Sequence, residues 1–326
     1  MMTRSADALA FWWMAPGRGE LVTERLPDPG PGQVLVRTLA SGISRGTERL
    51  VGQGLVPRSE WARMRCPNQS GEFSFPLKYG YTSIGMVEQG PEALVGKRVF
   101  CLFPHQDRFI VASAAIRPVP DAVPTNRTLL AANMETALNG CWDGALLPGQ
   151  RIVVLGAGVV GCLFAYLAKA TAGTEVTLCD LNEERATVAN ALGAQFCHPD
   201  RAPEDADLVV EASGSARALA RAVDLGGTEA TILVLSWYGS QVEGLPLGGA
   251  FHSRRLRIVS SQVGSLAPTM RPRWDYARRL DKALELLADP ALDNLVGHGS
   301  RFRDLPKDMP RILADPAVLM HPVLYS

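Results

Sequence analysis

A glycine-rich turn carries the most specific chemistry in this sequence. Residues 151–161, RIVVLGAGVVG, place a short apolar run directly before a G-x-G-x-x-G motif. In that motif the first glycine permits a tight turn, the second lets the backbone approach a pyrophosphate, and the third allows a helix to pack against the strand. The N-terminus of that helix offers free N–H groups to phosphates. We therefore expect a dinucleotide to bind here, through Gly156, Ala157, Gly158, Val159, Val160 and Gly161.

An acidic residue follows this turn at the spacing typical of dinucleotide-binding folds. The apolar run 175–179 leads into Asp180, nineteen residues after Gly161. A carboxylate at this place accepts hydrogen bonds from the adenosine ribose and repels a 2′-phosphate, so the sequence favours NAD over NADP. Arg185 lies close enough to weaken that preference, although a residue this early in a helix more often faces solvent.

Composition limits the partners that this protein can have. The 326 residues carry 33 basic and 33 acidic side chains, and 47% of them are hydrophobic, which fits a soluble globular protein of about two domains. A net charge of zero argues against broad attraction to nucleic acid or to a membrane surface. The apolar run 8–15 is too short to span a bilayer and has no cleavage site behind it. We expect a cytoplasmic protein that binds a small molecule, and neither nucleic acid nor membrane.

The sequence changes character near residue 125, and this change suggests two domains. Short strands with punctuating turns before that point predict a small barrel-like β domain. Strands then alternate with helices, which is the pattern of βαβ units on a parallel sheet. The strands expected there are 151–155, 175–179, 208–211, 231–235 and 255–261, and the helices are 128–146, 160–171 and 183–192. We predict a discontinuous first domain, 1–125 with 266–326, and a nucleotide-binding domain at 126–265.

The whole chain resembles the medium-chain dehydrogenase/reductase superfamily of zinc-type alcohol dehydrogenase-like proteins. The similar segments are PGPGQVLV (29–36), SGISRGTE (41–48), YGYTSIGMV (79–87), EASG (211–214) and NLVGH (294–298). The resemblance implies an α/β fold in which a GroES-like, β-rich catalytic domain accompanies a Rossmann domain with a doubly wound parallel sheet. SGISRGTE, the first active-site loop, is especially similar to the bacteriochlorophyllide dehydrogenase branch, but we do not carry over that branch's substrate.

The resemblance also implies roles for residues outside the glycine-rich turn. Arg45 is similar to the basic residue that contacts the cofactor pyrophosphate, which suits a guanidinium well. Ser213, within the EASG segment, is expected at the cofactor site. The strand 255–261 resembles the edge strand through which family members pair, so we expect a homodimer.

The positions that hold zinc in this family are altered. Family members place Cys in the first loop, His in a GHE motif in the second, and Cys or Glu before the nucleotide domain. Here these positions hold Ser44 or Arg45, then Tyr81, then Glu135. Catalytic zinc needs three good protein ligands, and this set is poor, so we expect a zinc-free member. The alternative is an unusual zinc site made of Glu48, His105 and Glu135.

The cysteines agree with that expectation. The family's four-Cys structural lobe is missing, because no CxxC pair or tight cluster occurs among Cys66, Cys101, Cys141, Cys162, Cys179 and Cys197. Scattered cysteines of this kind indicate reduced cytosolic thiols rather than a disulfide framework.

Without zinc, other groups must remove the hydroxyl proton and stabilise the substrate oxygen. The resemblance places Tyr81 at the lost His position and Thr47 at the position of a proton-relaying hydroxyl, and these form our leading pair. Ser44 adds a donor, while Glu48, His105 and Glu135 are candidates for tuning or transferring protons. Each has a structural alternative: Tyr81 could fill the space left by the metal, Glu135 could form a cap or an ion pair, and His105 could be a satisfied loop histidine.

A segment between the two active-site loops is rich in arginine and aromatic residues: Arg58, Trp61, Arg63, Arg65, Phe73, Phe75 and Lys78. One interpretation is that it walls the pocket of a bulky substrate with an anionic group. The other is a solvated surface loop.

We therefore expect an NAD(H)-dependent oxidoreductase that transfers hydride between nicotinamide and an alcohol/carbonyl substrate, without catalytic zinc. One alternative is a zinc-free, NADPH-dependent enone or quinone reductase, against which Asp180 argues. Another is a non-catalytic nucleotide-binding accessory protein that kept the fold and lost the chemistry.

Overall fold

The computed structural model describes residues 7–240 and 244–325. The chain divides into two compact units, of which the first contains the residues up to 132 and from 296 onward, and the second contains residues 133–295. These boundaries differ from the sequence-based limits at 125/126 and 265/266.

Helix α7 (Tyr276–Leu286) accounts for the later boundary. It follows residue 265, yet its Arg279 donates hydrogen bonds to Glu135 and Asn139 of α3 (Ala131–Asp143). All three side chains are buried. The chain after residue 265 therefore stays with the second unit until residue 295.

Antiparallel strands form most of the first unit. In its described part, one sheet has the strand order β2-β1-β5-β4, and a larger sheet has the order β16-β17-β3-β6-β7-β9 with β8 also paired to β3. The alternate residues Val34 and Val36 pack with Val87, Val99 and Phe109 in one buried cluster. The strands are β1 (Asp7–Ala15), β2 (Arg18–Arg25), β3 (Gln33–Ser44), β4 (Ser70–Gly71), β5 (Leu77–Lys78), β6 (Ser83–Gln89), β7 (Arg98–Cys101), β8 (Arg108–Ala112), β9 (Ile116–Pro118), β16 (Ser300–Arg301) and β17 (Met320–Leu324).

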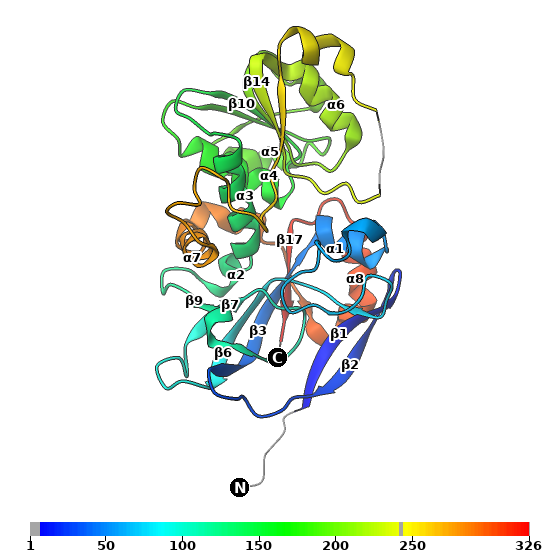
Figure 1. Ribbon diagram of the computed structural model, residues 1–326, viewed down its shortest axis with the longest axis vertical. Helices are drawn as coiled ribbons and strands as arrows, with labels where there is room; N and C mark the ends of the chain where they lie inside the picture. Colours follow the sequence, from blue (N-terminus) through cyan, green and yellow to red (C-terminus); the bar gives the residue numbers. More distant parts are fainter. Residues whose placement is uncertain (1–6, 241–243, 326) are drawn as a thin grey trace. The chain divides into compact units, whose positions relative to one another are not determined.

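The C-terminal strand completes this unit. Figure 1 shows β17 running beside β3, and the two strands pair antiparallel with Leu324 opposite Ala40. The helices and helical turns of the unit are α1 (Arg45–Gly52), η1 (Arg58–Glu60), η2 (Ser113–Ala115), α2 (Thr125–Thr128), η6 (Phe302–Asp304) and α8 (Leu305–Ala314).

The segment 41–48, which resembles an active-site loop, is instead a junction between a strand and a helix. β3 continues to Ser44 because β17 pairs with it as far as that residue, and Ile43 is fully buried. Helix α1 begins at Arg45. The side chains of 44–48 are thus held by two regular elements rather than by a loop.

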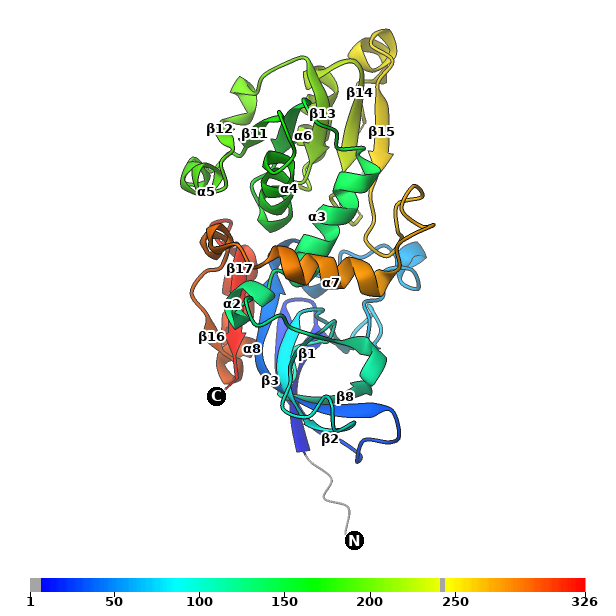
Figure 2. The same cartoon turned by 90° about the vertical axis from the view of Figure 1, so that its left-hand side faces the viewer.

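The second unit is built on a parallel sheet with the order β12-β11-β10-β13-β14-β15. This order is that of a doubly wound dinucleotide-binding sheet, so the predicted parallel sheet is confirmed. Figure 2 shows its strands together with α4, α5 and α6. The strands are β10 (Arg151–Leu155), β11 (Glu175–Cys179), β12 (Gln195–Cys197), β13 (Ala206–Glu211), β14 (Gly226–Val234) and β15 (Arg257–Ser260).

Helices fill the connections between these strands. They are α4 (Val159–Lys169), α5 (Arg185–Ala191) and α6 (Ala216–Leu225), together with the turns η3 (Pro199–Arg201), η4 (Leu247–Phe251) and η5 (Pro290–Leu295). Helix α6, which the sequence pattern did not reveal, begins at Ala216 and is capped by Ser215, whose hydroxyl accepts a hydrogen bond from the Ala218 N–H. Among the described residues, no helix is both long and apolar enough to cross a membrane.

Candidate active site

The glycine-rich turn connects β10 to α4 with the geometry that its glycines permit. Gly156 has φ +105°, and a Cβ there would lie 2.7 Å from Ser213 Cα. A Cβ on Gly161 would collide with the carbonyl oxygen of Gly156, so α4 could not pack as closely against the turn. A Cβ on Gly158 would meet no atom within 4 Å, which leaves open space in front of this residue.

The start of α4 suits an anion. Gly158 is its N-cap residue and has no side chain to bind the N–H groups of the first turn. The first N–H groups of a helix lack carbonyl partners in the preceding turn and carry the positive end of the helix dipole. The turn therefore fits the pyrophosphate of a dinucleotide, with its donors and open space on the same residues.

Asp180 follows β11 and lies beside this turn. One carboxylate oxygen accepts a hydrogen bond from the Ala157 N–H at 2.7 Å, and the other accepts one from the Asn182 N–H at 2.9 Å. These contacts fix the acidic group at the carboxyl edge of the sheet, where dinucleotides bind in such folds.

Arg185 differs from the expectation that it faces solvent, because its side chain is buried. It is the first residue of α5, and its guanidinium lies near Cys162 of α4. Burial raises the pKa of the Cys162 thiol to about 12, and the positive charge of Arg185 acts in the opposite direction. The Arg185 side chain has interaction partners within the protein, because it is buried at the start of α5.

Ser213 backs the glycine-rich turn through its main chain, while its hydroxyl is used internally. The hydroxyl and N–H of Ser213 both donate to the carboxylate of Glu211, at 2.5 and 2.7 Å. The hydroxyl of Tyr238 donates to the other oxygen of Glu211 at 2.5 Å. Glu211 is fully buried and so ties together the segments that follow β13 and β14.

In the first unit, three of the candidate catalytic side chains meet. The hydroxyl of Tyr81 forms hydrogen bonds with the side chains of Ser44 and Thr47. Tyr81 and Thr47 are partly exposed, whereas Ser44 is buried. The pKa of Tyr81 lies well above its usual value, because burial disfavours the phenolate and the nearby Glu48 carboxylate repels its charge; the two hydrogen bonds act in the opposite direction. At neutral pH Tyr81 is therefore a hydrogen-bond donor.

Glu48 and His105 form a buried pair next to these hydroxyls. His105 Nε2 lies 3.0 Å from Glu48 Oε2, and both side chains are 1% exposed. The other Glu48 oxygen accepts the Ser44 N–H at 2.9 Å. Gly80, with φ +140°, allows the segment before Tyr81 to lie against His105, because a Cβ there would approach the imidazole to 3.3 Å.

Glu135 belongs to the second unit and is committed to a buried ion pair. Arg279 Nε donates to Glu135 Oε1 at 3.0 Å, and the exposed fractions of the two side chains are only 2% and 7%. The structural alternative for Glu135 is therefore present, and its carboxylate is not a free ligand.

The donor groups do not fit a catalytic zinc ion. Both nitrogens of His105 and both oxygens of Glu48 already have protein partners, and Arg279 holds Glu135. Within the part of the chain that the structure describes, no three His, Cys, Asp or Glu side chains are grouped to hold a metal ion. Ser44 and Tyr81 supply only hydroxyls, which are poor zinc ligands.

The basic and aromatic segment is largely occupied by local contacts. Lys78 is buried and binds Glu24 at 2.7 Å, while Arg63 and Arg65 pair with Glu60 and Glu72 at the surface. Arg58 lies over the ring of Trp61 at 5.5 Å and pairs with no carboxylate among residues 7–240 and 244–325. Of the four basic residues, Arg58 is thus the one best placed to meet an anion.

Arg45 directly follows Ser44 in the first unit, and the Pro-Gly segment belongs to the same unit. Arg45, the first residue of α1, donates to the carbonyl of Leu313 at 3.5 Å.

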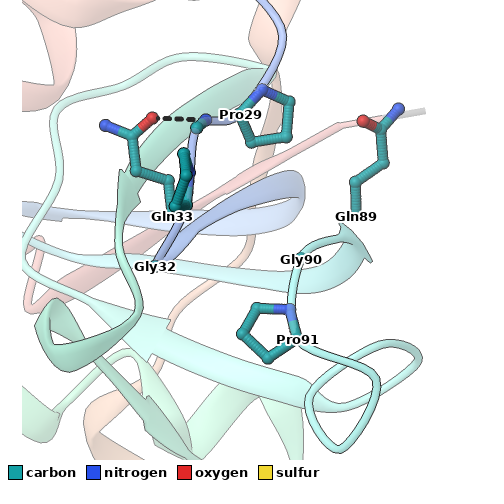
Figure 3. A pocket seen from close by; sticks show the side chains of 8 residues that line it. Pro29, Gly32, Gln33, Gln89, Gly90 and Pro91 are labelled. Atoms are coloured by element: carbon teal, nitrogen blue, oxygen red, sulfur yellow. Dashed lines mark hydrogen bonds between the residues drawn. The ribbon is translucent and has the colours of Figure 1, made fainter.

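The segment 29–33 lines an open hollow of about 600 Å³ together with 89–91, shown in Figure 3. Its polar side chains are Gln33 and Gln89, so the hollow carries no acid, base or nucleophile.

Several residues of the site could not be found by sequence reasoning. Cys66 donates a hydrogen bond to the Gly80 carbonyl at 3.4 Å, and burial raises the pKa of its thiol to about 12. The Ser41 hydroxyl forms hydrogen bonds with His105 and with the hydroxyl of Tyr325, and the Tyr238 hydroxyl donates a hydrogen bond to Glu211. Ser41 lay within a recognised motif and Glu211 within another, but neither motif indicates a tyrosine partner far along the chain.

No family model matches the sequence. Among curated proteins, the chain is similar to 2-desacetyl-2-hydroxyethyl bacteriochlorophyllide A dehydrogenase of Rhodobacter capsulatus, with 29% identity over 264 residues, 75% of this chain and 78% of that protein. It is also similar to sorbitol dehydrogenase of Homo sapiens, with 24% identity over 342 residues, 83% of this chain and 89% of that protein.

Solved structures share the same fold. One is an alcohol dehydrogenase (rspB) of Escherichia coli CFT073 with NADH, at a TM-score of 0.75, 16% identity and coverage of 98% of this chain and 99% of that chain. Another, assigned as a zinc-binding dehydrogenase of Sinorhizobium meliloti 1021, is bound to NADP, at a TM-score of 0.76, 17% identity and the same coverage. The predicted fold class, a GroES-like domain with a Rossmann domain, is confirmed.

Proposed function

Because the chain belongs to the medium-chain dehydrogenase/reductase superfamily of alcohol and sorbitol dehydrogenase-like proteins, we propose that it is an NAD-dependent dehydrogenase that interconverts an alcohol and a carbonyl compound without catalytic zinc. The observation that carries the proposal is the Tyr81 hydroxyl, held by Ser44 and Thr47. The resemblance to the family implies that Tyr81 stands at the position of a zinc-binding histidine. A phenol in this environment donates a hydrogen bond and can thereby stabilise negative charge on the substrate oxygen, which is one of the two tasks that zinc otherwise performs.

The cofactor proposal rests on the second unit. Gly158 and the uncapped start of α4 would hold the pyrophosphate, and Asp180 would accept the ribose hydroxyls. A 2′-phosphate would meet the Asp180 carboxylate, while the nearby Arg185 is buried and engaged, so NAD is favoured over NADP. Ser213 supports the turn, and Arg45 would add a charge-assisted contact to the pyrophosphate. When bound, the nicotinamide ring supplies the hydride acceptor or donor.

The residues of the first unit would handle the oxygen and its proton. In the carbonyl-reducing direction, Tyr81 donates a hydrogen bond to the substrate oxygen as negative charge develops there. As the hydride arrives, the Tyr81 proton passes to that oxygen, Thr47, hydrogen-bonded to Tyr81, gives its own proton to the phenol oxygen, and solvent water reprotonates the partly exposed Thr47. Ser44 supports the Tyr81 hydroxyl from the buried side. In the oxidising direction the same groups accept the proton in reverse order. The Glu48 carboxylate keeps Tyr81 protonated between turnovers.

The substrate and the assembly are part of the proposal. A bulky alcohol or carbonyl compound with an anionic group would meet Arg58 and the Trp61 ring beneath it, because Arg63, Arg65 and Lys78 have acidic partners. We propose a homodimer that pairs through β15. Six free cysteines are consistent with a reducing, cytoplasmic environment.

The test is a Tyr81→Phe variant assayed at 340 nm with NAD and a panel of bulky secondary alcohols, and with NADH and the matching ketones. Loss of one preorganised donor predicts a decrease in kcat of about 10²-fold, with little change in the dissociation constant of NADH. Tyr276→Phe, an exposed tyrosine of the second unit, is the matched control.

Three results would contradict the proposal. Full turnover by Tyr81→Phe would remove the catalytic role of the phenol. Turnover confined to enones with NADPH would indicate a reductase of activated C=C bonds. Tight NADH binding without turnover across the whole panel would indicate an accessory nucleotide-binding protein.

A further inference from the structure

A hydrogen-bonded network of four polar side chains runs through the interior of the first unit and extends the Glu48–His105 pair to Ser41 and Tyr325. The Tyr325 hydroxyl lies 2.9 Å from Ser41 Oγ, Ser41 Oγ lies 2.7 Å from His105 Nδ1, and His105 Nε2 lies 3.0 Å from Glu48. Ser41, His105 and Glu48 are each no more than 1% exposed. Four segments contribute, namely the residue after β17, β3, the segment after β7, and α1.

Strand pairing fixes Tyr325, the outer end of this network. β17 pairs with β3 in a register that places Leu324 opposite Ala40, and the Tyr325 N–H then donates to the Leu39 carbonyl. The Tyr325 ring stacks on Phe302 with ring centres 4.3 Å apart. The phenol is thereby held at Ser41 by the main chain and by an aromatic contact.

All donors and acceptors of this network can be paired when each hydrogen bond runs in the same direction, from Tyr325 toward Glu48. Tyr325 donates to Ser41, Ser41 donates to His105 Nδ1, and His105 Nε2–H donates to Glu48 Oε2. Glu48 then accepts the Ser44 N–H with its remaining oxygen, at 2.9 Å. Each buried polar group therefore has a partner, and the Glu48 carboxylate has one defined orientation.

Glu48, the inner end of this network, accepts a hydrogen bond from the Ser44 main chain. Ser44 is the N-cap of α1, a position whose hydroxyl normally binds N–H groups of the first helical turn, but its side chain forms no such cap here. Glu48, one turn into the helix, instead reaches back to the Ser44 main chain, similar to the acidic half of a capping box. The Ser44 hydroxyl is left for Tyr81, to which it is hydrogen-bonded.

We propose that His105, Ser41 and Tyr325 are positioning residues for Tyr81, which act by holding Glu48 in the orientation that fixes Ser44. This inference rests on the proposed function of Tyr81. Burying a network of polar groups costs desolvation free energy. Apolar side chains of similar size would stabilise the core at least as well. Orientation of the Tyr81 hydroxyl, rather than stability of the fold, therefore accounts for this network of polar side chains.

The experiment uses the full-length protein labelled with ¹³C-tyrosine. The Tyr81 ring signal is identified by its loss in Tyr81→Phe, and it is then followed in Tyr325→Phe, Ser41→Ala and His105→Gln. Positioning predicts that this signal shifts in all three variants and stays unchanged in Tyr276→Phe, the exposed control. These spectra need neither cofactor nor substrate, so they test the positioning separately from the proposed function.

Kinetics provide the second part of the experiment. Tyr325→Phe is expected to lower kcat about fivefold, the effect of one lost hydrogen bond, with an unchanged KM for NAD. In a Tyr81→Phe background the same substitution should have no further effect, because Tyr325 acts through Tyr81. An unshifted Tyr81 signal in all three variants, or additive losses of kcat in the double variant, would overturn the proposal.

Discussion

Tyr81 is the residue on which the proposed chemistry depends, and its surroundings decide its protonation. Burial and the Glu48 carboxylate both raise its pKa, so the phenol is the form present through the neutral range. A phenol can donate to a developing oxyanion, and because the phenolate is disfavoured, Tyr81 accepts a proton from an alcohol only as it passes its own proton to Thr47. Tyr81 is thus suited to stabilising the substrate oxygen, with Thr47 and Ser44 as its hydrogen-bond partners.

Asp180 is the residue that should decide the choice of cofactor. We expect Asp180→Ser to lower kcat/KM for NAD and to raise it for NADP, so that the ratio of the two falls by at least about tenfold. The substitution removes the carboxylate that we propose to bind the ribose and to repel the 2′-phosphate. Initial rates with both cofactors measure this ratio. Asn182→Ala, which keeps the Asp180 carboxylate and the N–H that it accepts, is the neighbouring control. An unchanged ratio in Asp180→Ser would show that the ribose is bound elsewhere.

Sequence reasoning at this scale selected residues within recognised motifs and missed the partners that lie far along the chain. Ser44, Thr47 and Tyr81 were selected from two motifs, and their side chains do meet. Glu135 was a candidate ligand, yet Arg279, which lies 144 residues later in the chain, holds it. A partner at such a distance depends on tertiary packing, for which the local pattern contains no signal.

The decisive elements are the two junctions where a strand runs into a helix. The junction between β10 and α4 forms the glycine-rich turn, and the junction between β3 and α1 presents Ser44 and Thr47. The first was predicted, because apolar runs and glycines mark its boundaries. The second was taken for a loop, because the pairing of β17 with the end of β3 cannot be read from residues 41–48.

Close packing of α4 against its turn leads to a prediction for Gly161. In Gly161→Ala the new methyl group would collide with the Gly156 carbonyl oxygen and push apart the turn and the helix. We expect NADH affinity to fall by at least about tenfold, since the pyrophosphate donors move, and the melting temperature to drop by several degrees. NADH fluorescence titration and thermal unfolding measure the two effects.

Gly248→Ala is the matched control for that variant. A Cβ on Gly248 meets no atom within 4 Å, so the same change of residue type brings no collision. Wild-type NADH affinity in Gly161→Ala would contradict the assignment of this turn to the pyrophosphate.

At the scale of the whole molecule, the free edge of β15 is the surface to consider. Among residues 7–240 and 244–325, β15 is the last strand of the sheet of the second unit, and its central residues Ile258 and Val259 are half-buried. The Ser261 N–H donates inward to β14, so by alternation the N–H of Ser260 points to the open edge. An open apolar edge of this kind favours pairing with a second copy.

Ser260→Pro tests this edge because it removes an outward N–H and leaves the bonds to β14 in place. We expect the wild-type protein and Ser260→Ala to be dimers by light scattering coupled to gel filtration, and Ser260→Pro to shift toward monomer. A dimer that survives Ser260→Pro unchanged would place the interface on another surface.

The two units and their fold class could be predicted from the sequence, since texture and motifs extend along the whole chain. The later boundary differed by 30 residues, from 265 to 295, because α7 joins the second unit through Arg279. Helix α7 is amphipathic and buries Arg279 together with Leu280, Ala283 and Leu284, and its periodicity does not reveal which residues elsewhere in the chain the buried arginine binds.

The most direct test of a zinc-free dehydrogenase is to measure zinc content and NAD-linked turnover on the same purified sample. Plasma mass spectrometry gives the zinc per chain, and absorbance at 340 nm gives the rate before and after treatment with a zinc chelator. We predict substoichiometric zinc and an NAD-linked rate that the chelator leaves unchanged. One zinc ion per chain, whose removal abolishes turnover and whose return restores it, would contradict the account.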